Sequence, residues 1–306
     1  MPSPWPTITY DQWRQTCDTL HAHTQVLGKL AVTLASPQPE LQHAALRLTP
    51  RGWETAPLPA PDGSGMFGVA LDLRAHQAIV ETSTGGIARV PLVPDRSVGT
   101  VTREVLAAVH DLVGPVEINM TPQEVPWTVP LDADEDHARY DPDQVAAYFA
   151  AATQAALVLA AFRAPYRGRS SPVDAWWGSF DLAVSLYSGR PADPSSDDFI
   201  TRNAMDAQHV TIGWWPGDQR YAEAAFYAYA YPAPPELPDA EISPGPAHWD
   251  AAMGEYILNW SDVCASSDPP STALEFCCSA FRYVGAADDW DPALSASADG
   301  IPPPVA

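Results

Sequence analysis

The sequence predicts an α+β fold, in which helices pack against sheets of antiparallel strands. Two observations lead to this class. Short apolar strand patterns follow one another with only turns between them, which favours antiparallel pairing. Segments with helical spacing stand before and after each series of strands, so the regular alternation of strand and helix that builds a parallel sheet is absent.

The first half of the chain is predicted to run helix, strands, helix. Apolar residues at helical spacing predict a first helix over 10–23 and a second over 97–113. Ser97 is placed to cap the second helix, and Gly114 follows its end. Alternating apolar residues between Gly, Pro and Asp turns predict the strands. These strands are 28–35, 44–48, 67–73, 78–82, 87–92 and 116–119.

The second half repeats this order. Residues 121–139 carry prolines and an acidic run, and we interpret them as a linker that the prolines hold extended. Pro142 opens a helix predicted to end near residue 164, and a closing helix is predicted over 272–284. Residues 291–306 are predicted to be a disordered tail. The strands predicted between the two helices are 176–187, 209–215, 226–231 and 255–260.

Short motifs of the first half recur in the same order in the second half, which predicts an internal duplication. Leu30-Ala-Val-Thr-Leu34 returns as Leu182-Ala-Val-Ser-Leu186, and other short matches follow with a growing offset. We therefore predict one α+β repeat over 1–120 and a second over 140–290. A duplicated fold places a groove on its pseudo-twofold axis, where a ligand could bind.

The composition limits the partners and the cellular setting. The chain has 306 residues and a net charge of −22, which argues against anionic membranes and against nucleic acid, whose phosphates require Lys and Arg on one face. Neither a signal peptide nor an apolar run approaching ~18 residues is present. The four cysteines lack the spacing of a zinc site. These features predict a cytoplasmic protein and leave its oligomeric state open.

One face of the strands predicted in the second half carries rings mixed with polar groups. Period-two alternation places these residues opposite the apolar core positions. We interpret the face as a wall that binds a ligand. The alternative is a second core layer in which each tyrosine hydroxyl bonds to backbone. The candidate ligand-binding residues are Trp177, Ser179, Asp181, His209, Trp215, Tyr227 and Tyr229, with Tyr231 on the same face.

Lysine is used once in the chain. Of the 16 basic residues only Lys29 is a lysine, and the aligned repeats place it at the position of Asp181. We expect a buried ion pair between the two that fixes how the repeats dock. The alternatives are that Lys29 holds a carboxylate or carbonyl of a ligand, or that it acts as a Schiff-base nucleophile.

The common catalytic signatures are absent. There is no GxGxxG after a strand, no Walker A motif, no HExxH and no GxSxG. The histidines are too widely spread to indicate a metal site, so we predict no metal and leave any cofactor unknown. Arg167-Gly-Arg169 is the densest basic spot; it could hold one anion, although a solvated loop is the simpler interpretation.

Four motifs stand out in the chain: TLHxxTQxxGK from Thr19, SPxxxWWGSFDLAV from Ser171, WWPG from Trp214 and FYAYAYP from Phe226. Together they resemble the motifs of a family of uncharacterised bacterial proteins classed as a domain of unknown function. The resemblance covers nearly the whole chain, from Trp5 to about Trp290. It implies a single family domain and brings no known activity.

The chain departs from the family pattern at two places. Asp174-Ala175 stands where a His-Phe pair is usual, and Glu40-Leu-Gln42 replaces a His-Trp-Trp stretch. These differences weaken any metal or aromatic site that would use those positions. The polar residues that remain of interest are Lys29, Asp181, Arg190 and His209.

These observations favour a protein that binds a small polar ligand, and possible turnover of that ligand is part of the hypothesis. Tryptophan and tyrosine rings would stack on it, while Lys29, Asp181 and His209 would orient it. A first alternative is a hydrolase- or lyase-type enzyme with His209 as general base near Asp181, and Lys29 stabilising negative charge. A second is a scaffold whose aromatic face receives a partner protein.

Overall fold

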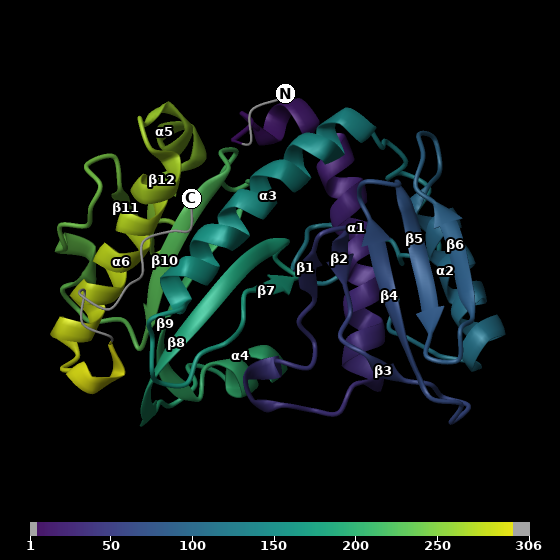
Figure 1. Ribbon diagram of the computed structural model, residues 1–306, viewed down its shortest axis with the longest axis horizontal. Coiled ribbons are helices and arrows are strands. Elements are labelled where there is room, and N and C mark those ends of the chain that lie inside the picture. Colours follow the sequence, from purple (N-terminus) through teal and green to yellow (C-terminus); the bar gives the residue numbers. More distant parts are fainter. Residues whose placement is uncertain (1–4, 296–306) are drawn as a thin grey trace. The chain divides into compact units, whose positions relative to one another are not determined.

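The structure is a computed structural model that describes residues 5–295 (Figure 1). It confirms the α+β class, because helices accompany two sheets of antiparallel strands. The chain divides into two compact units. The N-terminal unit comprises Tyr10–Phe149 and Asp174–Asp181, and the C-terminal unit comprises the described residues before Tyr10, Ala150–Val173 and those from Leu182 onward. These boundaries differ from the predicted repeats 1–120 and 140–290, and the duplication is not confirmed.

The N-terminal unit contains an antiparallel sheet with two helices on one side. Its helices are α1 (Tyr10–Leu34) and α2 (Val98–Val113), and its strands are β1 (Arg47–Thr49), β2 (Gly52–Glu54), β3 (Leu58–Pro59), β4 (Met66–Asp72), β5 (Gln77–Thr82), β6 (Ile87–Pro91) and β7 (Asp174–Trp176). The order in the sheet is β1-β2-β4-β5-β6, and β3 pairs with the start of β4. α1 contacts β4 while α2 contacts β5 and β6, so both helices cover the same face (Figure 1).

Several predicted elements of this unit are confirmed. The strands β4, β5 and β6 and the helix α2 closely match the predicted segments. The Ser97 hydroxyl accepts a hydrogen bond from the Thr100 backbone N–H, which is the predicted N-cap. Gly114 follows the last residue of α2 in a left-handed conformation that favours glycine.

The strand predicted over 28–35 is wrong, because Gly28–Leu34 is the last part of α1. Every residue from Thr19 to Ala31 is buried. A helix buried on all sides has no polar face, so its sequence lacks the amphipathic period by which a helix is recognised. Lys29 therefore lies on a helix while Asp181 begins a strand, and the two positions are not equivalent.

The strand predicted over 116–119 and the extended linker predicted over 121–139 are also wrong. Residues 115–139 form a packed loop without strands, in which Leu131 and Asp134 are buried. Gln25 of α1 holds this loop by two backbone hydrogen bonds. Its side-chain nitrogen donates to the Gln123 carbonyl at 2.8 Å, and its side-chain oxygen accepts from the Gln123 N–H at 2.8 Å. The prolines shape a loop that closes against the helix.

The C-terminal unit is built on a second antiparallel sheet. Its strands are β8 (Asp181–Pro191), β9 (Ala207–Trp215), β10 (Ala225–Tyr231), β11 (His248–Asp250) and β12 (Glu255–Asn259), and its helices are α4 (Phe199–Ala204), α5 (Trp260–Ala265), α6 (Pro269–Ala287) and the later part of α3 (Pro142–Arg163). The strands follow in the order β11-β12-β10-β9-β8. Trp260 of α5 packs on Trp214 and Phe226, which places this helix on the apolar face of the sheet. The strands predicted over 209–215, 226–231 and 255–260 and both long helices are confirmed.

The single strand predicted over 176–187 is interrupted. β7 ends at Trp176, and a turn over 177–180 precedes β8. Phe180 has a φ of 59°, a left-handed conformation that ends the alternation of side chains between the two faces. Trp177 and Ser179 consequently lie in the turn, whereas the prediction placed them on a strand.

Within residues 5–295, α3 is long and apolar enough to cross a membrane by length and composition. Ala151, Ala155 and Leu159 of this helix are completely buried, and Phe162 packs edge-on against Phe281 of α6. These contacts are those of a core helix, and the cytoplasmic setting remains a prediction.

Three short 3-10 helices complete the described chain, at Pro39–Leu41, Leu237–Asp239 and Pro292–Leu294. The last of these replaces the start of the predicted tail with ordered chain. Residues 296–306, the remainder of that prediction, lie outside the described residues.

Candidate functional site

Two of the sequence motifs dock on one another inside the N-terminal unit. The indole of Trp177 lies flat on the backbone of α1 at Gly28, where a Cβ atom would approach the ring carbons to 2.1 Å. Only glycine allows this approach. The Trp177 Nε1–H donates to the Ala44 carbonyl at 3.0 Å, so the ring is held from both sides. The contact joins α1 to residues 177–181, called here the WGSFD segment.

His21 fixes the backbone of the same segment. Its Nε2 lies 2.9 Å from the Trp177 carbonyl and 3.0 Å from the Gly178 carbonyl. Carbonyl oxygens only accept, so Nε2 carries the proton. His21, Gln25 and Gly28 are spaced by four and three residues, which places them on one face of α1. That face binds the WGSFD segment and the packed loop together.

Phe180 is the centre of a buried aromatic stack. Its ring stacks on His21, Tyr148 and Trp53, with ring centroids 4.9, 5.1 and 5.2 Å apart. The Trp53 Nε1–H donates to the Tyr148 hydroxyl at 3.1 Å. Burial raises the pKa of Tyr148 well above its usual value, so the phenol stays neutral. These contacts stabilise the left-handed conformation of Phe180.

Lys29 is 5% exposed, and its ammonium lies 5.4 Å from the centre of the Trp177 ring. The predicted ion pair with Asp181 is wrong: across residues 5–295 the Lys29 ammonium makes no ion pair or hydrogen bond. Burial lowers the pKa of Lys29, and no carboxylate opposes this effect.

The packed loop contains an ion pair between His137 and Asp134 that the sequence analysis missed. His137 Nδ1–H donates to the buried carboxylate of Asp134 at 2.7 Å, and the backbone N–H groups of Asp136 and His137 donate to its other oxygen. The bond to Asp134 raises the pKa of His137. Burial opposes ionisation of Asp134, but the hydrogen bonds from His137 and Asp136 keep its pKa below the usual range.

His23 lies on α1, and unlike His137 it has no hydrogen bond to a carboxylate within the described chain. It is 2% exposed, and its Nδ1 has no hydrogen-bond partner among the described residues. Burial lowers the pKa of His23 to about 4, although Asp134 acts in the opposite direction. His23 is therefore a neutral core residue at physiological pH.

The sheet of the C-terminal unit carries the part of the predicted aromatic face that lies on β9 and β10, without Trp177, Ser179 and Asp181. The strand register places Tyr231 opposite His209, Tyr229 opposite Thr211 and Tyr227 opposite Gly213. From β8, Tyr187 also lies opposite His209. The His209 ring contacts three tyrosines on this face, and its Nδ1 bonds the Ala207 carbonyl at 2.8 Å. Trp215 packs on Tyr227 with ring centroids 5.5 Å apart. His209 and Tyr227 are buried, while Tyr229 and Tyr231 are half-buried.

The other predicted ligand-binding residues take separate places. The Ser179 hydroxyl is exposed and donates to the buried Asp181 carboxylate. Arg190 donates to the backbone carbonyls of Asp288 and Asp289 at the end of α6, which is a helix-capping arrangement. Lys29, Trp177, Ser179 and Asp181 belong to the N-terminal unit, whereas Arg190, His209, Trp215, Tyr227 and Tyr229 belong to the C-terminal unit.

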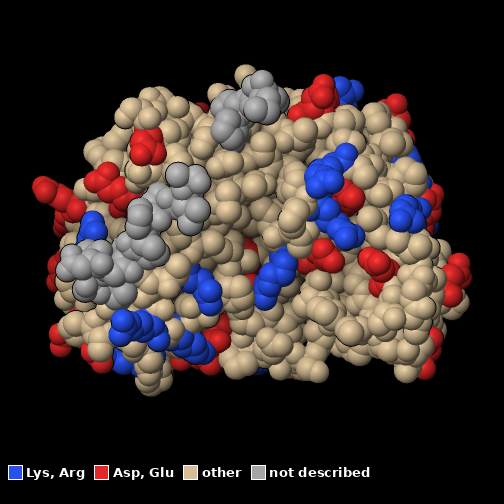
Figure 2. All heavy atoms as spheres, in the orientation of Figure 1, with Lys and Arg blue, Asp and Glu red and all other residues tan. Residues whose placement is uncertain are grey.

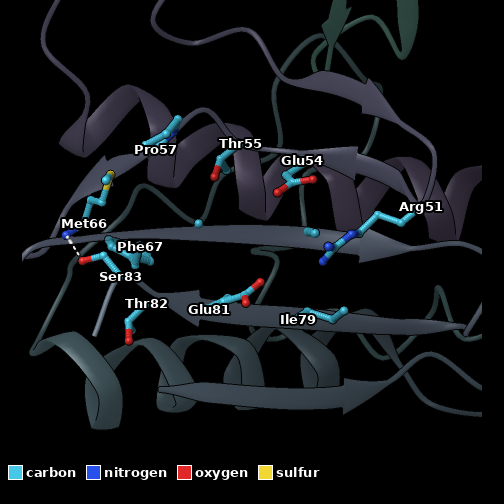
Figure 3. Close-up of a pocket in the computed structure, with 12 residues that line it drawn as sticks. Arg51, Glu54, Thr55, Pro57, Met66, Phe67, Ile79, Glu81, Thr82 and Ser83 are labelled. Carbon is cyan, nitrogen blue, oxygen red and sulfur yellow. Dashed lines mark hydrogen bonds between the residues drawn. The ribbon is translucent and has the colours of Figure 1, made fainter. Parts of the chain in front are cut away.

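A shallow groove of about 280 Å³ lies on the sheet of the N-terminal unit (Figure 3). Gly68 and Ala70 are among the residues that line it, and neither carries a side chain larger than a methyl group. Glu54, Glu81 and Arg51 approach it from neighbouring strands and from the β1–β2 turn, as Figure 3 shows. None of the residues predicted to bind a ligand lines this groove.

Among the described residues, no group of three His, Cys, Asp or Glu side chains could hold a metal ion.

Basic side chains gather where Figure 1 shows the C-terminal end of α3, in the lower left of Figure 2. At Arg163, the last residue of α3, and in the segment after it, the Arg169 guanidinium lies 4.0 Å from the centre of the Tyr187 ring, and Arg163 donates to the Ser170 hydroxyl. These arginines therefore have protein partners.

Comparison with known proteins identifies the family. The model of a family of unknown function, DUF5996, matches residues 5–297, so the chain belongs to this family. The match confirms the resemblance seen in the sequence. No curated protein and no solved structure matches the chain.

The packing of Trp177 on Gly28 gives a direct prediction. Gly28→Ala should lower the free energy of unfolding by about 1–3 kcal/mol, because the added methyl group must displace the indole. Gly285→Ala in α6 is the matched control, since nothing lies within 4 Å of its added Cβ. The control should be neutral or stabilising by up to ~1 kcal/mol. Urea unfolding of both variants makes the comparison, and a Gly28→Ala protein as stable as the wild type would contradict this packing.

The burial of His23 predicts that the folded protein loses stability as the pH falls. Its folded-state pKa is lowered to about 4, so only the unfolded state binds a proton as the pH falls from about 6.5 towards 4. Wild type should lose stability over this window by up to about 3 kcal/mol more than His23→Asn. His110→Asn removes an exposed histidine of α2 and should follow the wild type. Urea unfolding at several pH values tests this, and parallel curves for wild type and His23→Asn would refute it.

The unpaired Lys29 predicts an unusual stability change. Lys29→Met should match or exceed the wild type by on the order of 1 kcal/mol at neutral pH, because it removes a desolvated charge and breaks no ion pair. Since the folded-state pKa is lowered, the advantage should shrink as the pH rises towards about 10.4, where the unfolded lysine also loses its proton. Thermal melts between pH 7 and 10 measure the effect. A loss of about 3–5 kcal/mol would instead reveal a hidden acidic partner.

Proposed function

We propose that this protein binds a small polar ligand at Lys29, whose ammonium meets a carboxylate or carbonyl oxygen of that ligand beside the Trp177 ring. The observation that carries the proposal is a buried ammonium that contacts the Trp177 ring but has no ion pair or hydrogen bond within residues 5–295. The chain has 38 acidic side chains, yet its only lysine is buried without any of them as a partner in the described structure. A buried charge without a partner is unfavourable, and a bound ligand would supply the missing acceptor.

The surroundings of Lys29 favour a ligand that presents one acceptor group of modest charge. A single ammonium offers three donors and one positive charge, and it lies in the last third of α1, near the negative end of the helix dipole. A dianionic phosphate would lack the further donors that such groups usually receive. The Trp177 ring adds an apolar surface that a small organic ligand can cover.

The aromatic face around His209 is a second candidate for the same class of ligand. Its support is the half-buried pair Tyr229 and Tyr231, whose rings pack beside His209. The enzyme hypothesis, which combines His209, Asp181 and Lys29, and the scaffold hypothesis remain predictions that the proposal at Lys29 does not use.

The single lysine makes the test direct. Protein grown with lysine labelled at its ε-carbon carries the label only at Lys29, so one NMR signal reports on the site. Acetate, benzoate, lactate, pyruvate and inorganic phosphate serve as probes. We expect saturable shifts of this signal with the carboxylates and none with phosphate at the same concentration.

Calorimetry uses the carboxylate that shifts the Lys29 signal most. It should show binding to the wild type and to Arg89→Met, which removes an exposed arginine and so changes the net charge by the same amount as Lys29→Met. Lys29→Met should lose that binding by at least about tenfold. Native mass spectrometry of freshly purified protein adds a search for a retained metabolite. The proposal fails if no carboxylate moves the Lys29 signal and Lys29→Met binds as wild type does.

A further inference from the structure

We propose that the groove on the sheet of the N-terminal unit binds a free α-amino acid with an apolar side chain. This site is separate from Lys29, which is not among the residues that line the groove. The class of ligand differs as well, because the groove offers side chains of both charges whereas Lys29 offers a single cation.

Gly68 is the residue of the groove that the strand itself does not require. Glycine weakens the interior of a strand, and it usually marks a bulge, a bend or a place that another molecule approaches closely. The register of β4 with β5 runs unbroken through Gly68, which lies opposite Glu81, so no bulge is present there. A Cβ atom added to Gly68 would meet only the Thr55 hydroxyl oxygen within 4 Å, at 3.7 Å. Neighbouring chain therefore does not demand a glycine, whereas close approach of a ligand would explain it.

Two carboxylates lie on either side of β4 at this place. Directly opposite residues of paired strands share a face of the sheet, and Glu54 of β2 lies opposite Ala70 while Glu81 of β5 lies opposite Gly68. Gly68 and Ala70 are two residues apart and so share that face. Glu81 is exposed, which shows that this is the face that α1 and α2 leave open. Between the two carboxylates the strand carries nothing larger than a methyl group (Figure 3).

The charged side chains of the groove do not satisfy one another. Within residues 5–295 the side chains of Arg51, Glu54 and Glu81 make no ion pair and no hydrogen bond. In Figure 3 the Arg51 side chain reaches over β4, and its guanidinium ends between the two carboxylates. An ammonium and a carboxylate on one carbon atom would match this arrangement. The ammonium can donate to both glutamates, and the guanidinium fork accommodates a carboxylate.

The other end of the groove is apolar. Pro57 and Met66 line it, at the end that Figure 3 shows away from Arg51, and Met66 is 53% exposed. An apolar side chain of the ligand would remove this surface from water, which favours binding. The groove measures about 280 Å³, near the lower end of the range of roughly 300–1,000 Å³ for small-molecule sites, so it fits a ligand of the size of one amino acid.

Titration calorimetry at neutral pH tests the ligand class. Leucine, methionine and phenylalanine are compared with two analogues of leucine, isoamylamine, which lacks the carboxylate, and isocaproate, which lacks the ammonium. We expect saturable binding of at least one amino acid and at least about tenfold weaker binding of both analogues, because each leaves part of the charged end without a partner. If no amino acid binds, or if either analogue binds as tightly as leucine, the assignment is overturned.

Two variants place the ligand in the groove. Gly68→Val fills the space above β4 with a residue that favours strands, so its melting temperature should match or exceed that of the wild type. Its affinity for the amino acid should fall at least about tenfold, and that of Glu81→Gln should fall as well. Glu241→Gln removes an exposed carboxylate of the C-terminal unit and should bind as the wild type does. A folded Gly68→Val protein with unchanged affinity would refute the site.

Lys29→Met separates this site from the proposed one. It should keep the affinity of the wild type for the amino acid, because the groove does not use Lys29. If Lys29→Met loses the amino acid while Gly68→Val retains it, the ligand binds at Lys29 and the groove assignment falls, whereas the function proposed for Lys29 stands. Loss with Gly68→Val alone supports the groove, whatever the carboxylate probes show at Lys29.

Discussion

The contact between Gly28 and Trp177 decides how the N-terminal unit is assembled. α1 is buried on every side over Thr19–Ala31, so the polar groups on it need partners inside the protein. His21 and Gln25 find theirs in backbone carbonyl and N–H groups of two irregular segments. A single helix face therefore orders both the WGSFD segment and the packed loop, and the glycine sets the distance between helix and indole.

Burial also changes the pKa values of the ionisable groups on α1 and in the packed loop. His137 is paired with Asp134, and each stabilises the charged form of the other. Lys29 and His23 have no such partner in the described chain, and burial pushes both towards the neutral form. The neighbours differ: Asp134 of the packed loop pairs with His137, whereas the neighbour of the Lys29 ammonium is the indole ring of Trp177.

Local sequence signals predicted the helices and strands that have one buried face and one face of polar residues. The N-cap at Ser97, the strands of β4 to β6 and the face shared by His209, Tyr227 and Tyr229 follow from capping and period-two alternation. The end of α1 could not be predicted in this way, because complete burial removes the period of a helix. The turn that removes Trp177 from its strand depends on the left-handed Phe180, which tertiary stacking stabilises. Lys29 lies on α1 whereas Asp181 begins β8, so the ion pair that the aligned sequences predicted does not form.

The order of segments along the chain has a consequence for folding during synthesis. The N-terminal unit takes its last piece, Asp174–Asp181, from beyond a long excursion into the C-terminal unit. Until the ribosome has released that piece, the α1 face at His21 and Gly28 lacks its cover. A mid-helix glycine weakens the isolated helix by up to ~1 kcal/mol, so this region gains its stability from a contact of high sequence separation. The first unit to emerge is thus completed only after part of the second has been made, and in a nascent chain that ends at Phe149 this face of α1 would still lack its cover.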